Sequence, residues 1–181
     1  MCTRPVALAL FVLIFGATGC SGSAASAGSY DATTGLTRYR SAPVPLGRSA
    51  SAGYASDTEL ILRTEAECSG QDCVPASYTV SVSNTGSSEI AADFNQIAFS
   101  TLDGTVSFEP GGPADSSGSS VAFFSSGKGE LVRLSVPAGI FRSFATAPEL
   151  TVRLGASEYR LPYDSRSPLR RLLPDTDGAE L

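Results

Sequence analysis

Few side chains of this 181-residue chain are suited to acid–base or nucleophilic chemistry. The chain has no histidine, which excludes a Ser–His–Asp triad and removes the side chain that most readily exchanges protons near neutral pH. Glu65 and Glu67 are two residues apart, and a carboxylate pair can act as acid and base or bind a cation. Because the segment around them alternates, both side chains should point outward, and we expect solvated strand charges.

Ser125 and Lys128 have the Ser-x-x-Lys spacing used by one class of serine acyl-transfer enzymes. That chemistry needs a helix that brings both side chains to one face. Here Gly127 and Gly129 lie between two strand-like segments and predict a hairpin loop instead. The sequence therefore predicts that the protein is not an enzyme, and it indicates neither a cofactor nor a metal site.

The N-terminus has the features of an export signal. One basic residue, Arg4, precedes an apolar run over residues 6–15, and small residues follow. A transmembrane helix needs about 20 apolar residues, so this run is too short to span a bilayer. The pattern is typical of a signal peptide.

The segment Ala17-Thr18-Gly19-Cys20 resembles the lipobox of bacterial lipoproteins. This resemblance implies a signal peptide over residues 1–19 and a mature chain whose first residue, Cys20, carries a diacylglyceryl group and further acyl chains such as palmitate. Ser21 follows in place of Asp, which implies the outer membrane, facing the periplasm. The alternative is an ordinary secretory signal cleaved after Ala27, which would leave a soluble secreted product.

Two cysteines remain after this assignment. Cys2 leaves with the signal and Cys20 is acylated, so Cys68 and Cys73 are the free thiols of the mature chain. In an oxidising compartment two thiols separated by four residues suggest a disulfide across a tight loop between strands. A zinc site or a redox-active pair is the alternative, although zinc usually takes four Cys or His ligands and redox pairs are more often CxxC.

Composition divides the mature chain into three parts. Residues 20–56 are rich in Ser, Ala, Gly and Pro without an apolar period, which predicts a lipid-anchored flexible tether. Residues 57–174 have the size of one domain. Residues 175–181 carry three acidic side chains and predict a disordered tail.

Short alternating runs separated by turn residues fill residues 57–174, and this pattern predicts an all-β domain of antiparallel strands. The clearest run, at residues 76–83, places Tyr78, Val80 and Val82 on the inner face. The expected strands cover residues 58–67, 76–83, 90–99 with a break near Asn95-Gln96, 99–102, 105–108, 121–124, 131–136, 150–154 and 157–161.

Turn and capping residues add detail. Asp103-Gly104 predicts a two-residue hairpin turn, and residues 109–120 predict a long polar loop. Residues 140–147 are compatible with a short helix or a crossover. Ser167 and Pro168 predict a short C-terminal helix, with Ser167 as its cap and leucines that pack on the strands.

The run from Tyr78 to Gly86, followed by Leu102-Asp103-Gly104-Thr105, resembles the immunoglobulin-like domains of bacterial envelope lipoproteins. The resemblance implies an immunoglobulin-like antiparallel β-sandwich of seven or eight strands with a short C-terminal helix. The chain has no Trp, which a true immunoglobulin core contains, and a small β-barrel is the alternative fold.

The net charge of −5 and the scattered arginines argue against nucleic-acid binding. The expected partners are the membrane, through the N-terminal lipid, and an envelope protein or peptidoglycan. We therefore expect a membrane-anchored envelope lipoprotein that acts as a non-enzymatic binding or structural module. The alternatives are a carboxylate-dependent hydrolase and a small-ligand carrier.

Overall fold

The computed structural model describes residues 28–47, 59–86, 96–109, 120–124 and 129–174. These residues form eleven β-strands, two short α-helices and one 3₁₀ turn. The elements are β1 Gly28–Asp31, β2 Leu36–Arg40, β3 Val44–Gly47, β4 Leu60–Ser69, β5 Ser77–Asn84, β6 Ile97–Thr101, β7 Gly104–Phe108, β8 Ser120–Phe124, β9 Gly129–Pro137, α1 Ala138–Thr146, β10 Leu150–Leu154, β11 Ser157–Leu161, η1 Asp164–Arg166 and α2 Ser167–Arg170.

The strands form two antiparallel sheets. The larger sheet has seven strands: six follow the order β1-β2-β4-β5-β9-β8, and β3 pairs with β4 beyond the end of β2. The smaller sheet has the order β11-β10-β6-β7. The described strands do not close on themselves, so the small β-barrel proposed as an alternative from the sequence is wrong.

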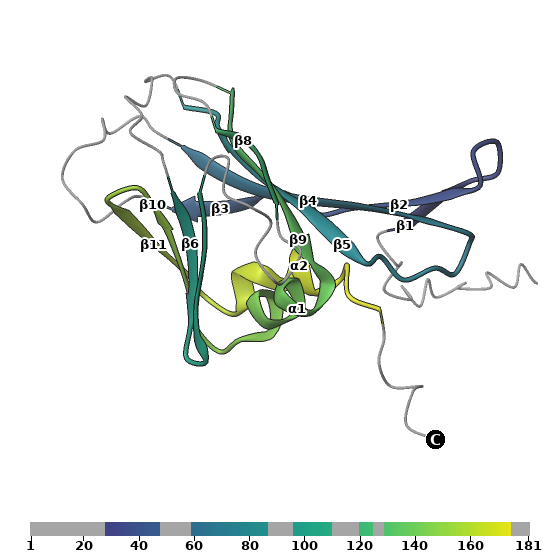
Figure 1. Ribbon diagram of the computed structural model, residues 1–181. Coiled ribbons are helices and arrows are strands. Elements are labelled where there is room, and N and C mark those ends of the chain that lie inside the picture. Colours follow the sequence, from purple (N-terminus) through teal and green to yellow (C-terminus); the bar gives the residue numbers. More distant parts are fainter. Residues whose placement is uncertain (1–27, 48–58, 87–95, 110–119, 125–128, 175–181) are drawn as a thin grey trace, which may run out of the picture.

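The two helices lie in the angle between the sheets (Figure 1). Their aromatic side chains connect the layers. Phe144 of α1 stacks on Phe99 of β6 with ring centroids 4.5 Å apart, and Phe141 of α1 stacks on Tyr78 of β5 at 4.1 Å. One continuous core therefore includes residues of both sheets and both helices.

The strands from β4 to β11 agree with most of the nine segments expected from alternation. Strand β6 joins the end of the 90–99 segment to the 99–102 segment, and residues 90–95 lie outside the described residues. Tyr78, Val80 and Val82 are buried, as expected for the inner face of β5. The segment left open between a helix and a crossover is helix α1. The hairpin between β6 and β7 is confirmed, but Thr101 pairs with Gly104, so its turn begins one residue earlier than expected.

The prediction of a flexible tether over residues 20–56 is wrong for residues 28–47, which form β1, β2 and β3. A search for apolar periodicity misses this segment, because Pro43 and Pro45 are typical of a linker. Pro45 nevertheless lies within β3, which among the described strands pairs only with β4, and a strand at a sheet edge tolerates proline. Ser41 bridges the interruption between β2 and β3. Its backbone N–H donates to the Thr64 carbonyl at 2.8 Å, and its Oγ accepts from the Thr64 N–H at 2.9 Å.

The C-terminal helix exists, with Pro168 in its first turn. Its N-cap is Arg166 and no side chain caps it, so the expected capping role of Ser167 is wrong. The reason is that η1 runs directly into α2, which places Ser167 inside the helical segment. Leu169 and Leu172 are buried in the core, as expected.

Candidate functional site

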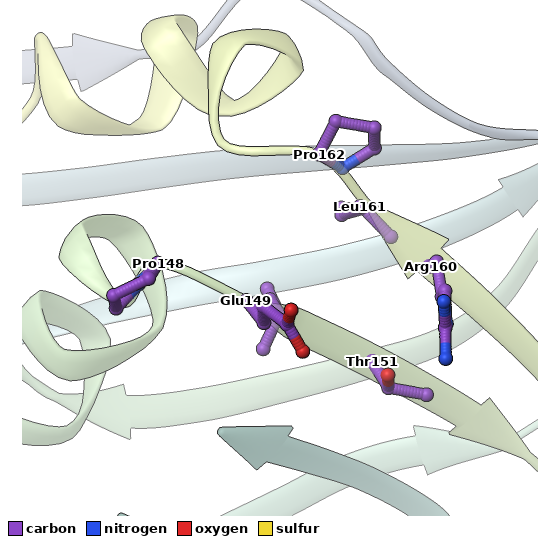
Figure 2. A pocket seen from close by; sticks show the side chains of 7 residues that line it. Pro148, Glu149, Thr151, Arg160, Leu161 and Pro162 are labelled. Carbon is purple, nitrogen blue, oxygen red and sulfur yellow. The ribbon is translucent and has the colours of Figure 1, made fainter. Parts of the chain in front are cut away.

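A hollow of about 190 Å³ opens where β10 begins and β11 ends. The strand register places Thr151 opposite Arg160 and Leu150 opposite Leu161. Figure 2 shows the side chains of Glu149, Thr151 and Arg160 on the same side of this strand pair. We call this hollow the β10–β11 groove; its lining residues are Pro148, Glu149, Leu150, Thr151, Arg160, Leu161 and Pro162.

Alternation along the two strands determines which side chains reach the groove. Leu150 and Leu161 are buried, whereas Glu149 and Arg160 are exposed. Since successive side chains of a strand point to opposite faces, Thr151 and Arg160 lie on the face turned away from the core. The groove therefore opens on the outer face of the smaller sheet.

A buried arginine holds the two sides of the groove together. The Arg166 side chain is 0% exposed, and its guanidinium donates to the carbonyls of Phe144, Ala147, Pro148 and Pro162. The bond from Nη2 to Ala147 is 2.6 Å long and the bond to Pro148 is 3.2 Å. Pro148 and Pro162 precede β10 and follow β11, so one side chain joins both ends of the strand pair.

The same arginine satisfies backbone groups that a helix leaves open. The last carbonyls of an α-helix have no partner within the helix, and a cation near that end interacts favourably with the helix dipole. Burial lowers the pKa of Arg166, and the neighbouring Arg170 lowers it further. An arginine nevertheless stays protonated in a protein, so all its N–H groups remain donors. The sequence gives no signal for this role, because the carbonyl partners lie up to 22 residues earlier.

Glu149 immediately precedes β10, two positions before Thr151, which pairs with Arg160 across the groove. Diagonal cross-strand neighbours have separations of roughly 7–8 Å, within reach of long side chains. Within the described part of the chain, neither side chain belongs to an ion pair. The groove therefore presents a carboxylate and a guanidinium, with the Thr151 hydroxyl near them, to solvent.

A second polar surface lies on β2 and β4. Arg38 Nε lies 2.7 Å from Glu67 Oε1, and Arg40 Nε lies 2.8 Å from Glu65 Oε1. These four residues form what we call the charge ladder, and they line a shallow hollow together with Ser29, Tyr39 and Ala66. Its side chains are at least half exposed, which limits the stability that such pairs contribute.

The outward position of Glu65 and Glu67 agrees with the sequence-based expectation, but their arginine partners were not expected. Arg38 and Arg40 belong to the segment assigned to the tether. The hydrogen bond to Glu67 and its charge raise the pKa of Arg38. Both carboxylates form ion pairs with arginines of β2, so they are not arranged as a facing acid–base pair.

The expected disulfide joins Cys68 to Cys73, with a Cα–Cα separation of 5.9 Å. The short loop that it closes packs against β2. Thr37 Oγ1 donates to the Gly70 carbonyl, and Tyr39 Oη donates to the Cys73 carbonyl at 2.8 Å. The disulfide loop is thus fastened to β2 of the larger sheet.

Several predicted positions lie outside the described residues: the signal peptide 1–19, the lipidation residue Cys20, the pair Ser125 and Lys128, and the tail 175–181. Among the residues that the structure does describe, no helix is long and apolar enough to cross a membrane. In the same residues, no group of three His, Cys, Asp or Glu side chains is arranged to bind a metal ion. Comparison of the chain with protein-family models, curated proteins and solved structures finds no match.

Proposed function

We propose that this protein is a lipid-anchored lipoprotein of the bacterial envelope, held in the outer membrane and facing the periplasm. In this proposal its β-domain is a non-enzymatic module that binds or supports another envelope component, either a protein or peptidoglycan. The observation that carries the proposal is the position of β1, which begins at Gly28, eight residues after the lipobox cysteine Cys20.

The short separation has a physical consequence for an anchored chain. Eight residues span at most about 26–29 Å when fully extended. A domain attached through lipid on Cys20 would thus stay close to the bilayer surface, with β1 and β2 nearest to the anchor. Two or three acyl chains are sufficient for such attachment to be durable.

The order of the strands supports an immunoglobulin-like sandwich as the finer description of the domain. Strands β4, β5, β9 and β8 follow one another as A, B, E and D do in an immunoglobulin domain, and β11, β10, β6 and β7 follow as G, F, C and C′. Phe99 lies on β6, the counterpart of the strand that carries the immunoglobulin Trp, and packs edge-to-face on Phe108 with centroids 6.0 Å apart. Strands β1 to β3 then extend the sheet beyond the A strand.

The alternatives have weaker support. A carboxylate-dependent hydrolase needs two carboxyl groups facing each other across a cleft, whereas Glu65 and Glu67 lie on one strand and bond to arginines. A small-ligand carrier needs an enclosed pocket, typically of about 300–1,000 Å³. The β10–β11 groove has about 190 Å³, and the hollow along the charge ladder, about 460 Å³, is open to solvent and lined by four charged side chains. An exposed binding surface fits this geometry better than either alternative.

The intact mass of the protein tests the anchor. We would express the full-length gene in a bacterial host, extract the membrane fraction with detergent and compare the product with a Cys20→Ser variant. The expected result is a chain that starts at Cys20 and carries lipid mass, with no lipid on the variant. An unlipidated chain that starts near Gly28 would refute the proposal and indicate a secreted domain.

A further inference from the structure

We infer that the β10–β11 groove binds a zwitterionic amino-acid end group, in which an ammonium and a carboxylate lie on the same or adjacent carbons. The inference deepens the proposed function, because it assigns the binding role to one surface and selects the peptide stems of peptidoglycan as its ligand. It begins from two opposite charges that line one hollow without pairing with each other.

The chemistry of the lining determines what kind of group fits. Glu149 offers an acceptor for an ammonium group, and Arg160 offers a planar fork of donors that matches a carboxylate. Thr151 lies opposite Arg160 in the register and adds a hydroxyl that can donate or accept. Figure 2 shows all three side chains on one side of the strand pair, so a single ligand can meet them together.

The backbone of the groove is fixed before any ligand arrives. Arg166 bonds to the carbonyls of both Pro148 and Pro162, one on each side of the groove. Its guanidinium is fully buried, so it is not available to the ligand and acts only on the frame. A rigid frame loses less conformational entropy when a ligand binds, and it keeps the backbone positions of Glu149 and Arg160 at a constant spacing.

The location of the groove favours a wall peptide over a zwitterionic lipid headgroup. The groove lies on the outer face of the smaller sheet, whereas β1 forms an edge of the larger sheet. Figure 1 shows β1 and the β10–β11 pair at opposite ends of the view, although β11 also contacts β3 of the larger sheet. In a protein anchored through Cys20, β1 is near the lipid. The groove then faces away from the membrane, where peptide stems are the source of amino-acid end groups.

The test is a calorimetric titration of the full-length mature protein, in detergent at low salt. The probe is the stem tripeptide that ends in meso-diaminopimelate, which has an ammonium and a carboxylate on one side-chain carbon. Glu149→Gln and Arg160→Gln each remove one charge from the groove. Arg153→Gln and Glu158→Gln are matched controls, because these residues pair with each other on the same face of the same two strands, two positions further along, and do not line the groove.

We expect binding of the tripeptide, with affinity reduced about tenfold or more by Glu149→Gln or Arg160→Gln and unchanged by the two controls. A tripeptide whose side-chain amine is acetylated should lose the same affinity. Absence of binding at millimolar tripeptide, equal losses in the controls, or binding of glycerophosphoethanolamine in preference to the tripeptide would each overturn the inference. A lipidated protein that fails this titration would refute the inference alone, since the mass measurement tests the anchor separately.

Discussion

Arg166 allows the sharpest test of how the fold is held together. Replacing it with Leu removes donors from four carbonyls, and the bonds to Phe144 and Ala147 are fully buried. An acceptor left buried without a partner costs about 1–3 kcal/mol. The loss is partly offset because the variant no longer buries a charge without a carboxylate partner. We expect Arg166→Leu to lower the free energy of unfolding by about 3 kcal/mol.

Urea unfolding followed by far-ultraviolet circular dichroism measures this change, since the chain has no Trp to report by fluorescence. For a domain of this size the loss corresponds to a fall in Tm of about 6–12 °C. Arg166→Lys keeps a charge but offers a single ammonium, so it should show an intermediate loss. The control is Arg171→Leu, which changes an exposed arginine close by in the chain.

An Arg166→Leu variant whose free energy of unfolding lies within about 0.5 kcal/mol of the parent, the range of ordinary surface substitutions, would refute this role of Arg166. That result would mean that the carbonyls find other donors. A loss as large in Arg171→Leu would also contradict it, because the effect would then belong to any arginine of this segment.

Two further substitutions test the core. Burial raises the pKa of Tyr78, whose Oη donates to the Leu172 carbonyl at 3.1 Å. The neutral phenol therefore contributes stability that is complete below about pH 10 and is lost as the pH rises through the raised pKa. Tyr78→Phe should cost about 1 kcal/mol at neutral pH and flatten that alkaline loss in urea titrations; an unchanged pH profile would contradict the assignment. Thr64 is 0% exposed and its Oγ1 has no hydrogen-bond partner, so Thr64→Val should stabilise the protein by about 1 kcal/mol, and a lower urea midpoint would show that the hydroxyl is satisfied.

Local patterns were sufficient to find the strands from β4 to β11, and in β5, β10 and β11 the buried residues alternate with less buried ones as expected. They failed for β1 to β3. The polar side chains of β2 make sense only beside Glu65 and Glu67, which lie more than 20 residues later in the chain. Pro43 and Pro45 also make the sequence of β3 resemble a linker, although Val44 and Leu46 are buried in the core.

The candidate site was even less accessible from sequence. Glu149 and Arg160 are ordinary strand charges until the pairing of β10 with β11 brings them to one face. The disulfide could be predicted, because the expected export signal and the short spacing of Cys68 and Cys73 can both be read from the sequence. The role of Arg166 could not be predicted, because no periodic pattern distinguishes an arginine that donates to distant carbonyls from one exposed to solvent.

The hairpin of β1 and β2 gives an anchored protein a particular mechanical behaviour. Gly28 pairs with Tyr39 at the open end of this hairpin, and Asp31 pairs with Leu36 near its turn. A force applied through lipid on Cys20 would separate the residue pairs of β1 and β2 one at a time, beginning with Gly28 and Tyr39. The pairs would not all be sheared at once. Releasing residues 28–35 would lengthen the link by roughly 27 Å while β4 to β11 keep their fold. In a protein anchored through Cys20, the edge hairpin would thus be an extensible segment that lengthens the connection between the membrane and the domain under force.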